Sequence, residues 1–303
     1  MTKRTHITAG ILVLGLGSSL ALTGCTSGSS ADEASSSDKG TITVGFLPSW
    51  TDAVNNAYLL EDQLTKLGYD VELETLTEPG MLYTALAQGD VDVYPSAWPE
   101  ISQKAFMEKY GDDLEDLGTY YEGAQGFLAV PDYMDDIDSV DDLHGQGDRF
   151  EGRIYTIEPG SGTATMASEK LFPTHGLDDE YTLTSSSLAA MLTVVDDAVE
   201  SEEDVVVTLW KPFWAIDAYG LKELEDPENG MGDPEGLHFL GHKGFAEEFP
   251  EAADLIGRIT LDDEQYGSLE NLVVNEYGSG QETEAIDAWL EEQGDRLDWA
   301  VTG

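Results

Sequence analysis

Residues 41–47, TITVGFL, form an apolar run rich in β-branched side chains, and residues 48–68, PSWTDAVNNAYLLEDQLTKLG, follow it directly. The first run predicts a buried strand. In the second, apolar side chains recur at helical spacing at Ala53, Ala57, Leu60, Leu64 and Leu67. Gly68 is a typical helix stop signal. This stretch therefore predicts a strand followed by a helix over residues 52–67.

The same alternation continues along the chain. Further strands are predicted over residues 71–76, 91–94, 127–130, 153–157, 181–184 and 204–209. Helices are predicted over residues 81–87, 163–172, 188–199, 246–259, 263–275 and 282–299. Alternating strands and helices favour parallel sheets, so we predict an α/β fold of two lobes, each a mostly parallel sheet flanked by helices. We place lobe I at residues 41–124 and 237–303, and lobe II at residues 125–236.

The N-terminal residues carry a targeting signal. Lys3 and Arg4 precede an apolar run over residues 11–22, which suits a signal peptide and is short of the roughly 20 residues that span a bilayer. The run ends in Leu22-Thr-Gly-Cys25, which resembles a lipobox. Cys25 is the only cysteine, so we predict a signal peptide over residues 1–25 and a lipid anchor at Cys25 on the extracytoplasmic face of the membrane. The alternative is an ordinary secretory signal with an incidental cysteine.

Residues 26–40 are rich in Ser, Gly and Asp and show no apolar periodicity, which predicts a flexible tether. Once Cys25 is lipidated, the chain has no thiol left for a disulfide, a metal site or a nucleophile.

Net charge is the oddest global property of the chain. It has 61 acidic and 14 basic residues and a formal charge of −47, which excludes nucleic acid and anionic lipid as partners. A trap for cations is one explanation. The acidic residues run along the whole chain, however, and this favours adaptation to a high-salt (halophilic) exterior.

Enzyme and metal motifs are missing from the sequence. It has no phosphate-binding loop with lysine, no His-Glu-x-x-His and no Gly-x-Ser-x-Gly. His238 and His242 are four residues apart in a predicted strand-to-turn region, where such a pair is usually packing or surface. We therefore expect no catalytic residues, no metal and no cofactor.

Three tryptophans follow predicted strands: Trp50, Trp98 and Trp210. Ligands in α/β folds lie beyond the carboxyl ends of strands. A quaternary ammonium donates no hydrogen bond, and tryptophan faces attract it by roughly 0.5 to 2 kcal/mol each. Any one tryptophan is more simply a large core residue, but three at strand exits favour an aromatic cage for a cation.

A possible anion site follows another predicted strand. Residues 158–163, EPGSGT, place flexible backbone at the start of a predicted helix, where free N–H groups favour a carboxylate. The alternative is a plain strand-to-helix turn.

Together, WTD at 50–52, YPSAWP at 94–99, LGTYYEG at 117–123, IEPGSG at 157–162 and WKPFW at 210–214 resemble the glycine betaine, proline betaine and choline-binding proteins of ABC importers. The resemblance covers residues 41–303. It implies a type II periplasmic-binding-protein fold whose two lobes close on a small quaternary-ammonium ligand. It also implies an ABC permease with its ATPase as partners, and we expect a monomer.

Matched to that family, the cage consists of Trp50 and Trp98 from the first lobe and Trp210 from the second. The carboxylate or polar end of the ligand falls on Gly162, Thr163, Ser161, Gln103 and Asp52. Gln103 stands where some members have a histidine.

Two further positions bear on the choice of ligand. Choline-binding relatives have an aspartate at the position of Asp52. They also carry a fourth aromatic residue where this chain has Gly126. The resemblance therefore implies glycine betaine or a related osmoprotectant, with choline as the alternative.

Two other classes of protein compete with a binding protein. A secreted, lipid-anchored enzyme would need a nucleophile–base or metal constellation, and a surface adhesin would show repeats or a sandwich pattern. Neither is present in the sequence, so we expect a binding protein without catalysis.

Overall fold

The computed structural model describes residues 39–301, apart from the side chain of Asp295. The predicted signal peptide, the lipid anchor at Cys25 and nearly all of the tether lie outside the described residues. Within residues 39–301, no helix is long and apolar enough to cross a membrane.

The first five elements follow the predicted alternation. They are β1 (Thr41–Phe46), α1 (Thr51–Leu67), β2 (Asp70–Thr75), α2 (Pro79–Gln88) and β3 (Val93–Ala97). Helix α1 ends at Gly68, which has φ 101°, a left-handed conformation that glycine adopts without strain. Strand β1 pairs in parallel with both β2 and β3. Strand β1 therefore lies at the centre of the parallel β2-β1-β3 end of the sheet.

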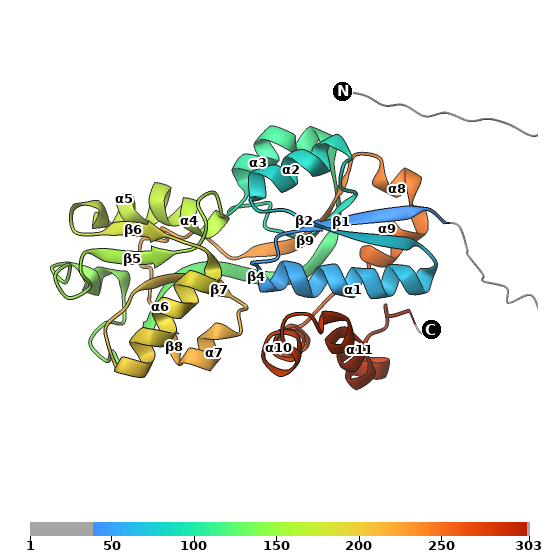
Figure 1. Cartoon of the computed structure of the whole chain (residues 1–303). Helices are drawn as coiled ribbons and strands as arrows, with labels where there is room; N and C mark the ends of the chain where they lie inside the picture. The colour runs from blue at the N-terminus through green and yellow to red at the C-terminus, as the bar shows by residue number, and fades with distance from the viewer. Residues whose placement is uncertain (1–38, 302–303) are drawn as a thin grey trace, which may run out of the picture. The chain divides into compact units, whose positions relative to one another are not determined.

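Strand β4 (Leu114–Pro131) is 18 residues long and joins the two ends of the sheet (Figure 1). Its residues 114–124 pair antiparallel with β9 (Glu235–His242), which also pairs antiparallel with β3. From Gln125 onward the same strand pairs with β7 (Val207–Lys211) and then with β8 (Leu221–Glu223). The register with β9 shifts near Gly118 and Gly123, both of which have positive φ.

The other end of the sheet is parallel again. Strand β5 (Arg153–Thr156) pairs in parallel with β6 (Thr182–Ser185) and with β7. The sheet order is β2-β1-β3-β9-β4-β7-β5-β6. The predicted α/β fold is confirmed, and the pairing is mixed: parallel at both ends and antiparallel around β4 and β9.

Helices cover the sheet on both sides (Figure 1). The remaining ones are α3 (Lys104–Tyr110), α4 (Gly162–Met166), α5 (Phe172–His175), α6 (Leu188–Ser201), α7 (Ala215–Tyr219), α8 (Phe245–Glu248), α9 (Pro250–Ile256), α10 (Asp263–Asn271) and α11 (Glu282–Gln293). A π-helical turn, Ala167–Leu171, joins α4 to α5. The helix predicted over residues 246–259 is in fact two, because Pro250 begins a new helix.

Two clusters of buried side chains form the core. The larger one extends from β1 and α1 through β4 to β7, and includes the fully buried Tyr94, Tyr120 and Trp289. The smaller one lies around Ile154 and Leu171. The larger cluster includes buried residues at or just after the carboxyl ends of β1, β3, β5 and β7. These four strand ends are therefore packed into one core.

Candidate ligand-binding site

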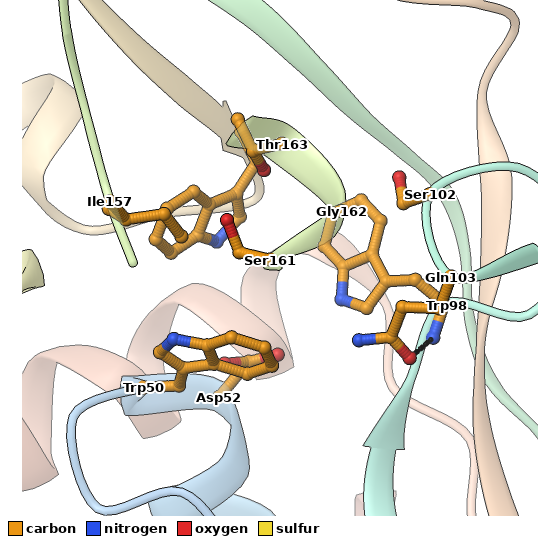
Figure 2. A pocket seen from close by; sticks show the side chains of 10 residues that line it. Trp50, Asp52, Trp98, Ser102, Gln103, Ile157, Ser161, Gly162 and Thr163 are labelled. Atoms are coloured by element: carbon orange, nitrogen blue, oxygen red, sulfur yellow. Dashed lines mark hydrogen bonds between the residues drawn. The ribbon is translucent and has the colours of Figure 1, made fainter. Parts of the chain in front are cut away.

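One cavity collects the residues that the sequence predicts for a ligand site (Figure 2). It is lined by Trp50, Asp52, Trp98, Ser102, Gln103, Ile157, Ser161, Gly162, Thr163 and Trp210. All eight predicted ligand-site residues are among them. Sequence reasoning missed Ser102 and Ile157. Ile157 directly follows β5 and was signalled by the strand-end rule, whereas Ser102 lies in an irregular segment that carried no signal.

The three tryptophans come from three strand ends. Trp50 precedes α1, Trp98 directly follows β3, and Trp210 is the next-to-last residue of β7. Each is at least nine-tenths buried although it faces a cavity. Their apolar rings therefore face a space largely withdrawn from water, where a cation–π contact is strongest.

Hydrogen bonds hold the Trp50 segment on both sides. The Trp50 indole N–H donates to Glu158 Oε2 at 3.3 Å. The hydroxyl of the next residue, Thr51, donates to Glu270 Oε1 at 2.6 Å. Glu158 follows β5 and Glu270 lies on α10, so carboxylates from two distant parts of the chain orient this segment.

Gln103 holds Trp98 in place. Its Oε1 accepts from the Trp98 backbone N–H at 3.0 Å and from the Tyr83 hydroxyl at 2.7 Å. Its Nε2 donates to the Tyr94 hydroxyl at 3.2 Å. Gln103 thus lines the cavity, but its amide group is already engaged in fixing the turn that carries Trp98.

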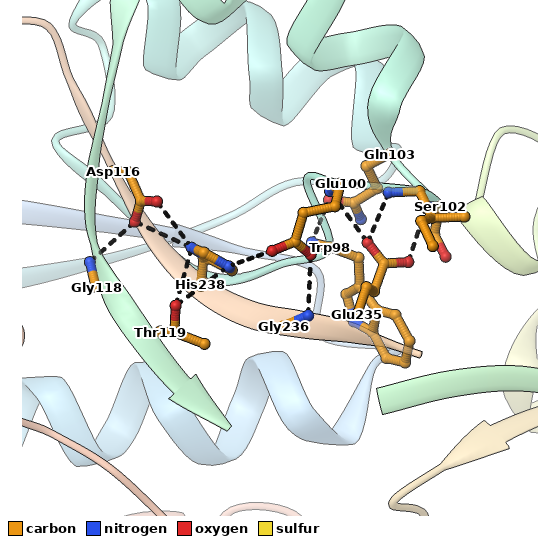
Figure 3. Close-up of polar contacts among 11 residues, drawn as sticks. Trp98, Glu100, Ser102, Gln103, Asp116, Gly118, Thr119, Glu235, Gly236 and His238 are labelled. Atoms are coloured by element: carbon orange, nitrogen blue, oxygen red, sulfur yellow. Dashed lines mark hydrogen bonds and ion pairs between the residues drawn. The ribbon is translucent and has the colours of Figure 1, made fainter. Parts of the chain in front are cut away.

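The same turn is held from β9 (Figure 3). Glu235 accepts backbone N–H groups of Glu100, Ile101 and Ser102 at 3.2, 2.9 and 2.8 Å. Glu100 in turn accepts from Gly236 N–H at 2.9 Å and lies 3.0 Å from His238 Nε2. The turn between Trp98 and Gln103 is therefore a rigid, ion-paired unit.

His238 lies between two carboxylates, because its Nδ1 is 2.9 Å from Asp116 Oδ2. Burial alone would lower the pKa of His238, but the hydrogen bonds and charges of Asp116 and Glu100 outweigh it and raise the pKa. His242 Nε2 is 3.3 Å from Asp92 instead. Within the described residues, the two histidines therefore lie against different carboxylates.

Trp210 is backed by another aromatic ring. It stacks on Phe213 with ring centroids 4.4 Å apart and planes at 27°. Gly126 lies directly opposite Trp210 in the β4–β7 register. A side chain at 126 would begin 2.8 Å from Met231 Cε and 3.9 Å from Thr163 Cγ2. Position 126 thus lies beside the cavity, and the space next to it is filled by Met231.

Backbone N–H groups face the cavity at the start of α4. Ser161 is the N-cap, and its hydroxyl accepts from Ala164 N–H at 3.2 Å. Its carbonyl accepts from Thr165 N–H. Among residues 39–301, the N–H groups of Gly162 and Thr163 have no acceptor. Free N–H groups at the positive end of a helix dipole suit a carboxylate.

Gly162 also touches the opposite wall of the cavity. A Cβ atom at 162 would lie 2.9 Å from the backbone carbonyl carbon and oxygen of Ser102 and would overlap its side chain. Only glycine lets the start of α4 approach the Trp98–Gln103 turn this closely.

Asp52 is a buried carboxyl group at the edge of the cavity. It is 2% exposed and accepts a hydrogen bond from the Ser96 hydroxyl. Burial raises its pKa, and hydrogen bonds from Ser96, the Ala53 backbone and Trp98 oppose the rise. No Lys, Arg or His within the described residues forms an ion pair with it.

The cavity has a volume of about 30 Å³. That is room for one or two water molecules. A trimethylammonium group therefore enters only if the walls move apart, with Trp50 and Trp98 on one side and Gly162 and Trp210 on the other.

Residues 40–292 match the family model described as the substrate-binding domain of ABC-type glycine betaine transport systems. The chain belongs to this family. The matched range includes every residue of the cavity, so the predicted class, a substrate-binding protein of an ABC transporter, is confirmed.

Individual family members show similar sequence and fold. A glycine betaine/carnitine transport binding protein of Listeria monocytogenes is 29% identical over 154 residues, which span 50% of this chain and 49% of that protein. The glycine betaine/L-proline-binding protein of Borrelia burgdorferi superposes with a TM-score of 0.78 at 28% identity, over 86% of this chain and 96% of the other. A lactococcal binding protein, solved in its closed conformation with glycine betaine, superposes with a TM-score of 0.78 at 27% identity, over 86% of this chain and 99% of the other. These neighbours are two-lobed periplasmic binding proteins, which confirms the predicted fold class.

Proposed function

We propose that the protein captures glycine betaine or a related quaternary-ammonium solute and delivers it to an ABC permease for osmoprotection. The ammonium group would lie among the rings of Trp50, Trp98 and Trp210, and the carboxylate on the N–H groups of Gly162 and Thr163 beside Ser161. One observation carries this proposal: three tryptophans and a helix start with two free N–H groups line the same cavity.

The two ends of a betaine need opposite environments, and the cavity offers both. Aromatic faces attract a cation that cannot donate hydrogen bonds. Backbone N–H groups at a helix start attract an anion without a basic side chain. A relative of similar fold was solved with glycine betaine bound. These facts favour a zwitterion over a simple cation.

Choline is the second candidate, because Asp52 lies in the cavity wall and can accept a hydroxyl proton. Gly126 argues against it, since the chain lacks the fourth aromatic residue of the choline-binding relatives. We therefore place choline below glycine betaine.

Two lobes, at residues 41–124 with 237–303 and at residues 125–236, would open to admit the ligand. The partner change of β4 supports this division, because the strand pairs with β9 up to Ala124 and with β7 from Gln125. We further propose that the protein is a monomer anchored through Cys25 on the outer face of the membrane.

Calorimetric titration of the unliganded protein with glycine betaine, proline betaine, carnitine and choline tests the ligand assignment. We expect the betaines to bind more tightly than choline. If choline binds at least about tenfold more tightly than every betaine, a gap of about 1.4 kcal/mol, the choline assignment replaces ours. If no quaternary ammonium binds, the cage proposal is wrong.

A further inference from the structure

Glu270 is a buried carboxyl group outside the cavity, on α10. It is 1% exposed. Its two oxygens accept two hydrogen bonds: Oε1 from the Thr51 hydroxyl at 2.6 Å and Oε2 from the Trp214 backbone N–H at 2.7 Å. The glutamate therefore has one donor on each side of it, and the two donors come from segments far apart in the chain.

Both donors are directly coupled to cage tryptophans. Thr51 is the residue after Trp50. Trp214 follows Phe213, whose ring stacks on Trp210 at 4.4 Å between centroids. A single side chain therefore connects the segment that orients Trp50 to the segment that supports Trp210. These two tryptophans stand on the opposite walls that must separate to admit a ligand.

We propose that Glu270 is a positioning residue for ligand binding, whose carboxyl group links the Trp50 and Trp210 segments and so keeps the two walls closed around the ligand. This inference rests on the proposed binding of a quaternary ammonium in the cage. The link is broken when the Trp210 segment moves away from α10, so it contributes to holding ligand and not to the fold of either segment.

The surroundings of Glu270 supply hydrogen-bond donors and no ion-pair partner. No basic side chain among residues 39–301 pairs with it. Burial raises its pKa to about 8, the Asp52 charge adds to the rise, and the bonds from Thr51 and Trp214 oppose it. Other titratable groups packed nearby are the buried hydroxyls of Tyr120 and Tyr266. The raised pKa shifts this carboxyl group toward its neutral form.

A glutamine can bond to the same two partners without a charge. Its amide oxygen accepts the Trp214 N–H, and its NH₂ group donates to the Thr51 hydroxyl oxygen, so the Thr51 bond is kept with its direction reversed. A methionine of similar length fills the same space and makes neither bond. Glu270→Gln and Glu270→Met therefore separate the link from the volume of the side chain.

The experiment measures the dissociation rate of glycine betaine by stopped-flow tryptophan fluorescence at neutral pH. We expect Glu270→Met to speed dissociation about tenfold, and Glu270→Gln to stay within about twofold of the parent. Ser268→Ala is the matched control: it lies on the same helix and loses the bond that Trp289 Nε1 donates to it at 2.9 Å, and within the described residues its hydroxyl bonds only to Gln265, Trp289 and Gln293. We expect this variant to lower the melting temperature and leave the dissociation rate unchanged.

The possible outcomes separate this inference from the proposed function. If the parent protein binds no quaternary ammonium, the proposed function fails, whatever the variants do. If the parent binds and Glu270→Met dissociates within twofold of it, Glu270 is not a positioning residue. If Glu270→Gln dissociates as fast as Glu270→Met, the charge of Glu270 matters and the hydrogen-bonded link is refuted. Should Glu270→Met not fold, Glu270→Gln is compared with the parent instead: dissociation about tenfold faster than the parent refutes the hydrogen-bonded link, and dissociation within about twofold supports it.

Discussion

The two walls of the cavity are built in different ways. The wall with Trp50, Asp52 and Trp98 consists of side chains: those of Trp50 and Asp52 are hydrogen-bonded to other side chains, and Trp98 is fixed through its backbone N–H. The opposite wall carries the Trp210 ring and the start of α4, which presents backbone: the free N–H groups of Gly162 and Thr163, with a glycine at the point of closest approach. The three rings suit a cation, and the start of α4 suits an anion.

This difference predicts how substitutions in each part of the cavity will change ligand affinity. A side-chain wall can be weakened one ring at a time, because the other rings still contact the ligand. A backbone wall has no group that a substitution can delete, so it is damaged only by changing how closely it approaches. We expect graded losses of affinity for the three rings and an all-or-none loss at the start of α4.

The largest effect is expected from Gly162→Ala. Its methyl group would overlap Ser102 and keep the walls apart, so affinity for glycine betaine should fall at least about 100-fold, or about 2.7 kcal/mol. Calorimetric titration measures this loss. The matched control is Gly267→Ala on α10, where a Cβ meets nothing within 4 Å. Alanine there favours the helix, and the affinity should not change. If Gly162→Ala binds glycine betaine normally, the close approach of the start of α4 to Ser102 is not needed for binding.

Graded losses are expected for the tryptophans. Trp50→Ala, Trp98→Ala and Trp210→Ala should each cost about 1 to 3 kcal/mol of binding free energy, from lost cation–π attraction and lost contact. Trp289 lies on α11 and is fully buried, with its indole N–H bonded to Ser268 of α10, so Trp289→Ala should lower the melting temperature and spare affinity. Tight betaine binding by all three cage variants, with loss of binding in Trp289→Ala, would place the site elsewhere.

Asp52 sharpens the comparison within the first wall. Asp52→Asn should weaken choline by about tenfold and glycine betaine by less than about threefold, because only choline donates a hydroxyl proton to the carboxylate. Burial raises the pKa of Asp52, so its carboxylate forms only as the pH rises through that pKa. Choline affinity should therefore increase with pH over that range in the parent and stay flat in Asp52→Asn. Titrations at several pH values measure both effects, and equal losses for the two ligands would contradict them.

The smallest effect on binding is expected from salt. Cage and backbone contacts are short-range and buried, so affinity should change less than about threefold between dilute buffer and molar NaCl. Stability should change more, because the net charge of −47 repels itself and molar salt shortens the Debye length to about 3 Å. Melting curves and titrations over the same salt series compare the two. A melting temperature that is flat or falls with salt would refute adaptation to high salt.

Much of the fold was predictable because periodicity and stop signals are local. The strand and helix at residues 41–67 were placed within a residue of β1 and α1. The first part of β4 was missed, since residues 114–124 carry glycines and acidic residues and become a strand only by pairing with the distant β9. The α8–α9 break was missed because the apolar spacing continues across Pro250.

The candidate site was predictable where it consists of side chains. Tryptophans after strands are visible in a sequence, and a glycine-rich turn before a helix marks free N–H groups. Glu270 was not predictable: it is one of 61 acidic residues, and nothing local distinguishes a buried carboxyl group from the solvated ones. The role proposed for Glu270 depends on its hydrogen bonds with Thr51 and Trp214, and these residues lie next to it only in the tertiary fold.

The position of β9 in the sheet affects the order in which the strands of this protein can pair. It lies between β3 and β4 in the sheet, yet residues 235–242 emerge from the ribosome long after both neighbours. Until then, β3 and β4 each present an unpaired edge, and such edges attract other strands. A chain cut before residue 235 would keep both edges open permanently. Truncated or stalled copies should therefore aggregate or be degraded, while the complete chain closes its sheet in one late step.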